Sequence, residues 1–515
     1  MDANGLLTVL AILVAGYSLL SDEKRLDIRL RISWLDWLIL GLSILFVLII
    51  IYMPVIKSFE LFVPLPWMFG FNEETTTFAV LVFIIFFFGN KVLGKKLSKT
   101  KLHAWKYVSD RLLREKKFSE LAYLLEKYHM QLIKWIRHDV WYVNLHRFIQ
   151  PKLIPTIIMM AGKEKRPLSD SLRIGLAKLV PDHSNMQDII KMSISRILKS
   201  KSFVAYLAET HPMVAARFTS VRFRDDDEFI TIYFEALISH PESALYRELR
   251  DNQNCSYTGE YYLDESNSLL NYYLKNVDMA CNLSIWQPIA EYVIVFIQNQ
   301  KGKDNIYNQP CDRFSDGDER WSCPIFIGSL FFTVMVSLAI FQRKKDHMWL
   351  MYCDNFIEEI LKNLDHSPEV DKNREFPSRF DYLLYVIFSA CDKWVGAVKY
   401  IDYKDVKEED RKYFTEYWAA KTLGSMLRKL IKSDKLSDSQ KSYFLTIAIR
   451  RMKSLDQSCH DRYSKLIINN CIREYEHDAV DKDTIDLLEE VYRQVDHVLK
   501  SDESTFERLI TKFNK

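Results

Sequence analysis

The segment Gly89–Lys96, with the sequence GNKVLGKK, is the part of the chain that comes nearest to a phosphate-binding loop. Such loops read GxxxxGK followed by Ser or Thr, because the glycines let backbone N–H groups approach phosphates and the hydroxyl binds Mg²⁺. Here Lys96 stands in the place of that hydroxyl, and the segment follows an apolar run instead of a sheet strand. We therefore interpret its lysines as contacts to anionic lipid, each worth about 1 kcal/mol.

The acidic run Asp225–Glu228 offers carboxylates of the kind that bind hard cations. Adjacent carboxylates point in different directions, however, and no second acidic cluster accompanies them, so we interpret the run as a solvated turn that caps a helix. The eight cysteines lie between Cys255 and Cys471, without a CxxC pair or a histidine pair at metal spacing. We expect them to be unpaired, buried thiols.

Sequences typical of hydrolases, zinc proteases, dinucleotide-binding folds and EF-hands (GxSxG, HExxH, GxGxxG) do not occur in the chain. The sequence therefore predicts no catalytic residue, no metal site and no cofactor, and favours a protein that is not an enzyme. Beyond residue 106 the basic and acidic residues nearly balance. Because nucleic-acid binding needs a basic surface, we expect no nucleic-acid partner.

Three uncharged apolar runs occupy the first 90 residues: Gly5–Leu20, Trp37–Met53 and Thr75–Gly89. A bilayer core about 30 Å thick needs roughly 17 to 25 helical residues, so the runs predict three transmembrane helices. A cleaved signal peptide would begin with basic residues, whereas this chain begins with MDAN. Residues 1–90 are therefore expected to be a three-span anchor.

The orientation of these spans follows from the Lys and Arg residues in the connecting segments. Four lie after the first run, one lies between the second and third, and six lysines lie between residues 91 and 106. This distribution predicts a multi-pass protein of the inner (plasma) membrane, with its N-terminus outside and the region after the spans in the cytoplasm. Residues 91–106 form a basic juxtamembrane segment, and the residues expected at the membrane interface are Trp34, Trp37, Trp67, Lys91, Lys95, Lys96, Lys99 and Lys101.

Another stretch, Cys323–Phe341, is also long enough to cross a membrane without a charge. If it crossed, it would export Arg343, Lys344 and Lys345, against the positive-inside rule. We therefore interpret it as a buried helix of a large helical domain.

The remaining chain shows a helical period, for example at 413–431 and 485–499. We expect a mainly α protein whose cytoplasmic region is a helical array or a multi-helix bundle, divided into subdomains 107–250 and 260–515. Two segments depart from this period. Arg25–Ile32 alternates as a strand would, and Val221–Phe234 predicts a short hairpin or a strand that leads into a helix.

The polar segment 298–322 carries three aromatic residues, Tyr307, Phe314 and Trp321. Aromatic side chains are frequent anchors of protein interfaces, so the segment is a candidate partner-binding surface. The alternative is an ordered loop whose aromatic side chains pack back onto the domain.

The stretch LSDEKRLDIRLRISWLDW, residues 20–37, resembles uncharacterised bacterial membrane-anchored proteins of antiviral (antiphage) defence systems, as does the layout of an anchor followed by a helical domain. The resemblance implies an adaptor, sensor or effector subunit that acts through protein–protein interaction. Its expected partners are a bilayer with an anionic inner leaflet and a soluble protein or further copies of this chain. The alternatives are an oligomerising membrane-permeabilising effector or channel subunit, and a membrane-localised enzyme.

Overall fold

The computed structural model describes residues 15, 18–32, 34–52, 73–94, 97, 101–137, 184–221, 226–311, 314–372, 374–474, 478–496, 500 and 505–508. Within these residues every regular element is a helix, and extended pairing is confined to two isolated bridges, Cys255–Tyr261 and Pro310–Ser378. The expectation of a mainly α protein is therefore confirmed. The chain forms two compact units, one comprising Met1–Leu207 with Ser220–Asp225 and the other comprising Ala208–Thr219 with Asp226–Lys515.

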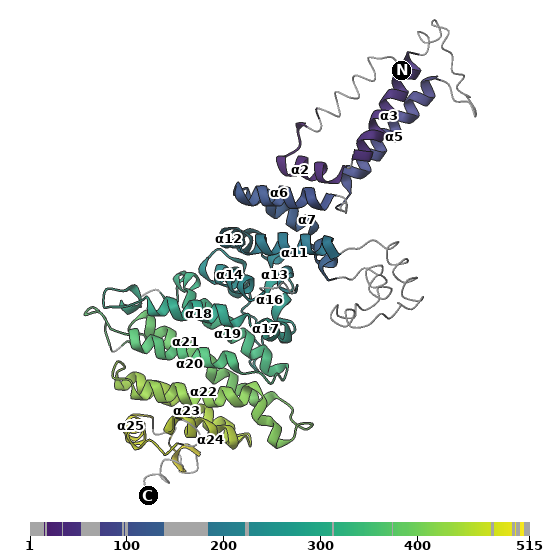
Figure 1. The fold of residues 1–515 in the computed structure, drawn as a ribbon. Coiled ribbons are helices and arrows are strands. Elements are labelled where there is room, and N and C mark those ends of the chain that lie inside the picture. The colour runs from purple at the N-terminus through teal and green to yellow at the C-terminus, as the bar shows by residue number, and fades with distance from the viewer. Residues whose placement is uncertain are drawn as a thin grey trace, which may run out of the picture. The chain divides into compact units, whose positions relative to one another are not determined.

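The first unit contains two groups of helices (Figure 1). In one group α3 and α5 lie side by side, with Val47, Leu81 and Ile84 buried between them. In the other, α6 and α7 pack against α11. The bounds are α2 Asp22–Arg31, α3 Trp34–Ile51, α5 Glu73–Leu93, α6 Leu102–Arg114, α7 Phe118–Ile136 and α11 Ser184–Leu198; α12, Lys201–Thr210, crosses the boundary of the unit.

The strand period of Arg25–Ile32 is misleading, because residues 25–31 belong to helix α2 and Ile32 is the residue that follows it. The buried side chains of the helix are Asp27, Ile28, Leu30 and Arg31. Asp27 and Arg31 are four residues apart and form an ion pair, which a helix permits and a strand would not. The expectation of a strand was therefore wrong, since the alternation counted only the apolar positions and ignored a buried charged pair.

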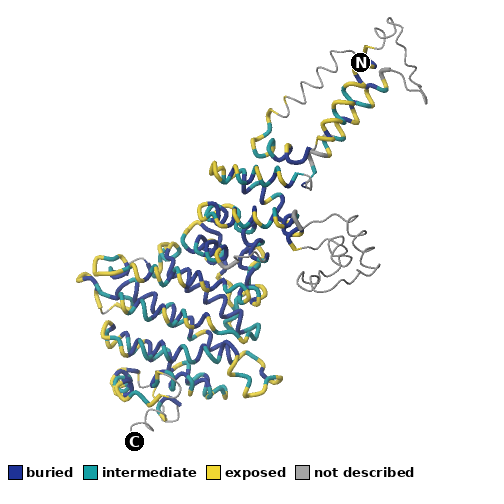
Figure 2. Tube along the Cα trace, in the orientation of Figure 1, coloured by how far each residue is buried: buried dark blue, intermediate teal, exposed yellow. Residues whose placement is uncertain are grey.

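The second unit is a stack of helices in which each layer packs on the next and buries the side chains between them (Figures 1 and 2). Helix α18 packs on α20, α20 on α22, and α22 on α24. The bounds are α13 Pro212–Thr219, α14 Asp226–Ser239, α15 Ala244–Asp251, α16 Ser268–Leu274, α17 Val277–Leu283, α18 Trp286–Gln298, α19 Pro324–Phe341, α20 Met348–Asn363, α21 Arg379–Ala397, α22 Thr415–Lys432, α23 Asp438–Gln457, α24 Asp461–Ile472 and α25 Lys482–Arg493.

Helix α19 occupies the centre of this unit and packs on α14, α15, α18, α20, α21 and α22. Every residue of α19 except Phe341 is buried, as expected for a core helix. Its hydroxyl groups are satisfied inside the unit, since Ser329 and Thr333 donate to carbonyls one turn earlier and Ser337 donates to the carbonyl of Gly259 at 2.6 Å. The apolar surface of α19 is therefore covered by protein.

The two units meet near residues 207–226, and the division of the cytoplasmic region into 107–250 and 260–515 stays a prediction. Residues 251–260 form a turn closed by the Cys255–Tyr261 bridge and bound to α19 through Gly259. Helix α14 begins at Asp226, in agreement with a helix that starts at the aspartates, and residues 222–225 lie outside the described residues.

Close helix packing in this unit depends on a glycine in α22. A methyl group on Gly424 would overlap the backbone carbonyl of Ile467 in α24. The two helices therefore approach each other at a point where no side chain fits.

Candidate membrane interface

Helices α3 and α5 expose large apolar side chains over most of their length. On α3, Trp34 is 68% exposed and Trp37 is 60% exposed; on α5, Phe78 is 65% exposed and Phe86 is 74% exposed. Soluble proteins rarely expose a contiguous apolar surface of this extent, and such surfaces mark contact with lipid or with another protein. Neither the segment from Trp37 to Ile51 nor that from Thr75 to Gly89 contains an ionisable residue.

The length and composition of a helix decide whether it could cross a membrane. Among the described residues, one helix, α19, is long and apolar enough by itself to cross a membrane, and up to three spans exist if each of two bent helix pairs counts as one. One of these pairs is α2 with α3, bent by 89°, and the other is α17 with α18. The apolar part of α5, Thr75–Phe87, is shorter, and most of Gly5–Leu20 lies outside the described residues.

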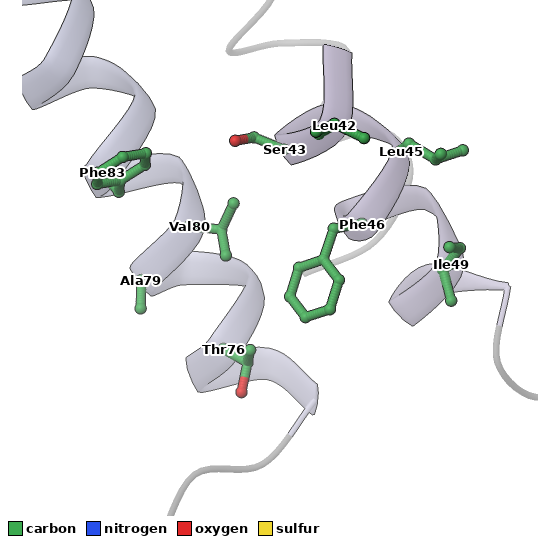
Figure 3. Close-up of a pocket in the computed structure, with 9 residues that line it drawn as sticks. All are labelled: Leu42, Ser43, Leu45, Phe46, Ile49, Thr76, Ala79, Val80 and Phe83. Atoms are coloured by element: carbon green, nitrogen blue, oxygen red, sulfur yellow. The ribbon is translucent and has the colours of Figure 1, made fainter. Parts of the chain in front are cut away.

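An open groove of about 600 Å³ runs between α3 and α5 (Figure 3). Phe46 and Val80 point into the space between the two helices, and the polar groups of its lining are the hydroxyls of Ser43 and Thr76. Small and hydroxyl-bearing residues are frequent where helices contact one another inside membranes. The groove can therefore receive an apolar helix or a lipid chain, but it offers no group for acid–base chemistry.

A buried charge cluster attaches α2 to α7. Asp27, which is 1% exposed, accepts hydrogen bonds from Arg31 and from the Tyr128 hydroxyl, and its Oδ2 lies 2.6 Å from Nζ of Lys127. Burial, together with the hydrogen bond to Asp27, raises the pKa of Tyr128 well above its ordinary value, so the phenol keeps its proton and donates it. The cluster joins residues about 100 positions apart in the sequence.

The segment that follows α5 is held by the same two helices. Arg31 donates to the carbonyl of Gly94, and the side-chain amide of Gln131 in α7 exchanges two hydrogen bonds of 2.9 Å with the backbone of Leu97. Leu97 itself is buried. Helices α2 and α7 therefore fix the chain as it leaves α5, which positions the start of the basic segment relative to α3.

The structure describes some of the residues predicted at the membrane interface and not others. Trp34 and Trp37 lie in the first turn of α3, Lys91 lies in the last turn of α5, and Lys101 is the residue before α6. Trp67, Lys95, Lys96 and Lys99 lie outside the described residues. Sequence reasoning did not identify Asp27, Lys127 or Gln131, because their importance depends on contacts between helices distant in the chain.

The aromatic residues of segment 298–322 pack largely onto the second unit. Tyr307 is 6% exposed and its ring lies 5.2 Å from that of Phe380, while Phe314 is 1% exposed and lies under the Arg379 guanidinium. Trp321 is half-buried, with its ring edge against Phe326. Burial favours the alternative in which these side chains stabilise the domain; the partner-binding role of the segment stays a prediction.

The other candidate sites show no catalytic arrangement. Gly89–Leu93 are helical, so their N–H groups cannot form a phosphate cradle. In the part of the chain that the structure describes, no group of three or more His, Cys, Asp or Glu side chains could hold a metal ion. None of the eight cysteines forms a disulfide, but the expectation of buried thiols was wrong for Cys255 and Cys459, which are exposed, and for Cys281, which is partly exposed. Burial raises the pKa of the Cys471 thiol to about 12, which leaves it protonated and unreactive.

Comparison with models of protein families, with curated proteins and with solved structures finds no match for this chain.

Proposed function

We propose that this protein is a membrane-anchored adaptor or sensor whose helical second unit binds a soluble protein in the cytoplasm. The observation that carries the proposal is the charge-free, exposed apolar surface of α3 and α5. Covering such a surface with lipid recovers roughly 25 cal/mol per Å² of apolar area. Without lipid this apolar surface would face water, because no other described part of the first unit covers it.

The geometry of α2 supports this arrangement. Because α2 is turned by 89° from α3, a membrane crossed by α3 would have α2 lying along its surface. Lys24 and Arg29 on α2 are exposed, and cations at this position favour an anionic leaflet. Helix α2, held by Asp27, would then connect the anchor to α7 at the membrane surface.

Topology reporters test the proposed anchor. The distribution of basic residues predicts that both Lys106 and Asp346 lie in the cytoplasm. Fusions to alkaline phosphatase and to green fluorescent protein after each residue should both give cytoplasmic signals, and the full chain should resist extraction by carbonate. A periplasmic signal after Asp346 would make α19 a span, and release by carbonate would refute the anchor.

A second candidate is an effector that oligomerises and permeabilises the bilayer, and the groove between α3 and α5 is the observation that favours it. Its small and hydroxyl-bearing lining, with Ser43 and Thr76, suits contacts between spans. Without ionisable groups it is poorly suited to conduct ions. Expression of residues 1–106 should therefore leave the membrane potential unchanged, and rapid depolarisation would favour the effector over the adaptor.

The resemblance of residues 20–37 to membrane proteins of antiphage defence supports a role in that process. This stretch contains α2, with the buried Asp27, and the first turn of α3. Cells that carry the protein with its neighbouring genes should resist phage infection, and deletion of its gene should abolish the resistance. Unchanged plaque numbers after deletion would contradict the role in defence without affecting the proposed anchor.

A further inference from the structure

A groove of about 440 Å³ lies between α21 and α23 in the second unit. Its lining residues recur at intervals of three to four along each helix, so that each helix presents one polar face. From α21 come Tyr385, Asp392 and Lys393, and from α23 come Tyr443, Arg450 and Arg451. The groove has the size of a small-molecule site and is too short for a folded partner.

A guanidinium group held by a neighbouring carboxylate lines the groove. Arg451 donates two hydrogen bonds to Asp392, of 2.9 Å from Nε and 2.6 Å from Nη2, and both side chains are more than four-fifths buried. Its place depends on Gly396, since a methyl group there would overlap the guanidinium group. This arrangement holds Arg451 in one orientation, as an anion-binding arginine requires.

Further cations lie near this arginine, and none of them forms an ion pair with a residue that the structure describes. Lys393 and Arg450 are exposed on the rim of the groove, and Lys399 lies at its end, where its ammonium group donates to Ser454. The carboxylate of Asp392 is taken by Arg451. The groove therefore keeps an excess of positive charge, although the second unit as a whole is acidic, with 39 Lys and Arg against 50 Asp and Glu.

One end of the groove is aromatic. The rings of Tyr385 and Tyr443 lie 5.9 Å apart and separate the groove from a second hollow of about 140 Å³, which Arg374 and Glu375 line. Tyr443 is 37% exposed, so its ring remains accessible. Burial raises the pKa of its hydroxyl to about 12, and the hydroxyl stays a donor near neutral pH. Such a ring offers a stacking surface to a planar base.

We propose that the groove between α21 and α23 binds a nucleotide, with its phosphates at Lys393, Arg450 and Arg451 and its base against Tyr443. Guanidinium and ammonium groups supply the charge-assisted hydrogen bonds that phosphate prefers, and the tyrosine ring supplies the contact that inorganic phosphate lacks. This inference does not depend on the membrane anchor. It gives the second unit a ligand to sense in addition to the protein partner proposed above.

Binding can be measured on the full chain in detergent by isothermal titration calorimetry with ATP and with GTP. Adenosine and pyrophosphate serve as probes of the two halves of the ligand. We expect saturable binding of at least one nucleotide, with adenosine and pyrophosphate each binding about tenfold or more weakly. No binding of either nucleotide at millimolar concentration would overturn the proposal, and so would pyrophosphate binding as tightly as the nucleotide, because the base contact would then be absent.

Variants locate the site. Arg450→Ala and Lys393→Ala should each weaken nucleotide binding about tenfold, whereas Lys407→Ala, at an exposed position outside the groove, should not. Tyr443→Phe should retain binding and Tyr443→Ala should lose it. Circular dichroism must show that all five variants keep the helical content of the parent. Equal loss in the Lys407 variant, or unchanged binding in both Arg450 and Lys393 variants, would overturn the assignment.

Discussion

Replacement of Asp27 by Asn tests whether α2 is held to α7 by a buried charge. The carboxylate is 1% exposed on its side chain and interacts with Arg31, whose side chain is 5% exposed, and with Lys127 at 21%. The amide keeps the shape of the residue and can still accept from Tyr128. It removes the negative charge, however, and leaves the Arg31 cation buried without its counter-ion.

Breaking one partner of a buried ion pair costs about 3–5 kcal/mol. Lys127 is partly exposed and can turn toward water, and Arg31 keeps its hydrogen bond to Gly94, so we expect the lower end, about 3 kcal/mol. For a unit of this size each kcal/mol lowers the Tm by about 2–4 °C, which predicts a loss of roughly 6–12 °C for the first unit.

A matched control lies on the same helix. Asp22 pairs with Arg25 at 3.6 Å, but its side chain is 84% exposed, and a surface pair of this kind is worth about 0–1 kcal/mol. Asp22→Asn should therefore leave the Tm within about 4 °C of the parent. Differential scanning fluorimetry in detergent measures both, and trypsin cleavage after Lys24 or Arg29 reports the release of α2. Equal Tm values for the two variants would refute the argument, as would the failure of Asp27→Asn/Arg31→Met to recover stability relative to Asp27→Asn.

Three further changes address the second unit. Burial raises the pKa of the Glu416 carboxyl from 4.5 to about 7, so the folded protein keeps a proton that the unfolded chain releases. The free energy of unfolding should therefore fall as the pH rises from 4.5 to 7. Glu416→Gln should abolish this part of the pH dependence in thermal melts. Gly424→Ala should lower the Tm by several degrees because the methyl group meets α24, whereas an exposed helical Gly→Ala change would raise it. Changing the three aromatic residues of segment 298–322 to Ala should also lower the Tm of the full chain by several degrees; an unchanged Tm with loss of a partner in a pull-down would instead support the interface.

Periodicity and composition predicted the fold class, two amphipathic helices and the burial of a third, apolar helix. The spacing of apolar residues over 413–431 and 485–499 predicts helices, and the structure has α22 and α25 there. The positive-inside argument favoured a buried position for Cys323–Phe341, and α19 is the central helix of its unit. These features are local, since a helix needs only neighbours within one or two turns and a continuous apolar surface needs a cover.

The candidate sites depended on contacts that no local pattern contains. Asp27 meets Lys127 across about 100 residues, and Arg451 meets Asp392 across 59. The alternation in Arg25–Ile32 favoured a strand until packing against α7 selected the helical face with the charged pair. A single sequence shows which residues can carry charge or stack, but the free energy of bringing two such groups together depends on burial and distance, and these arise only when the helices pack.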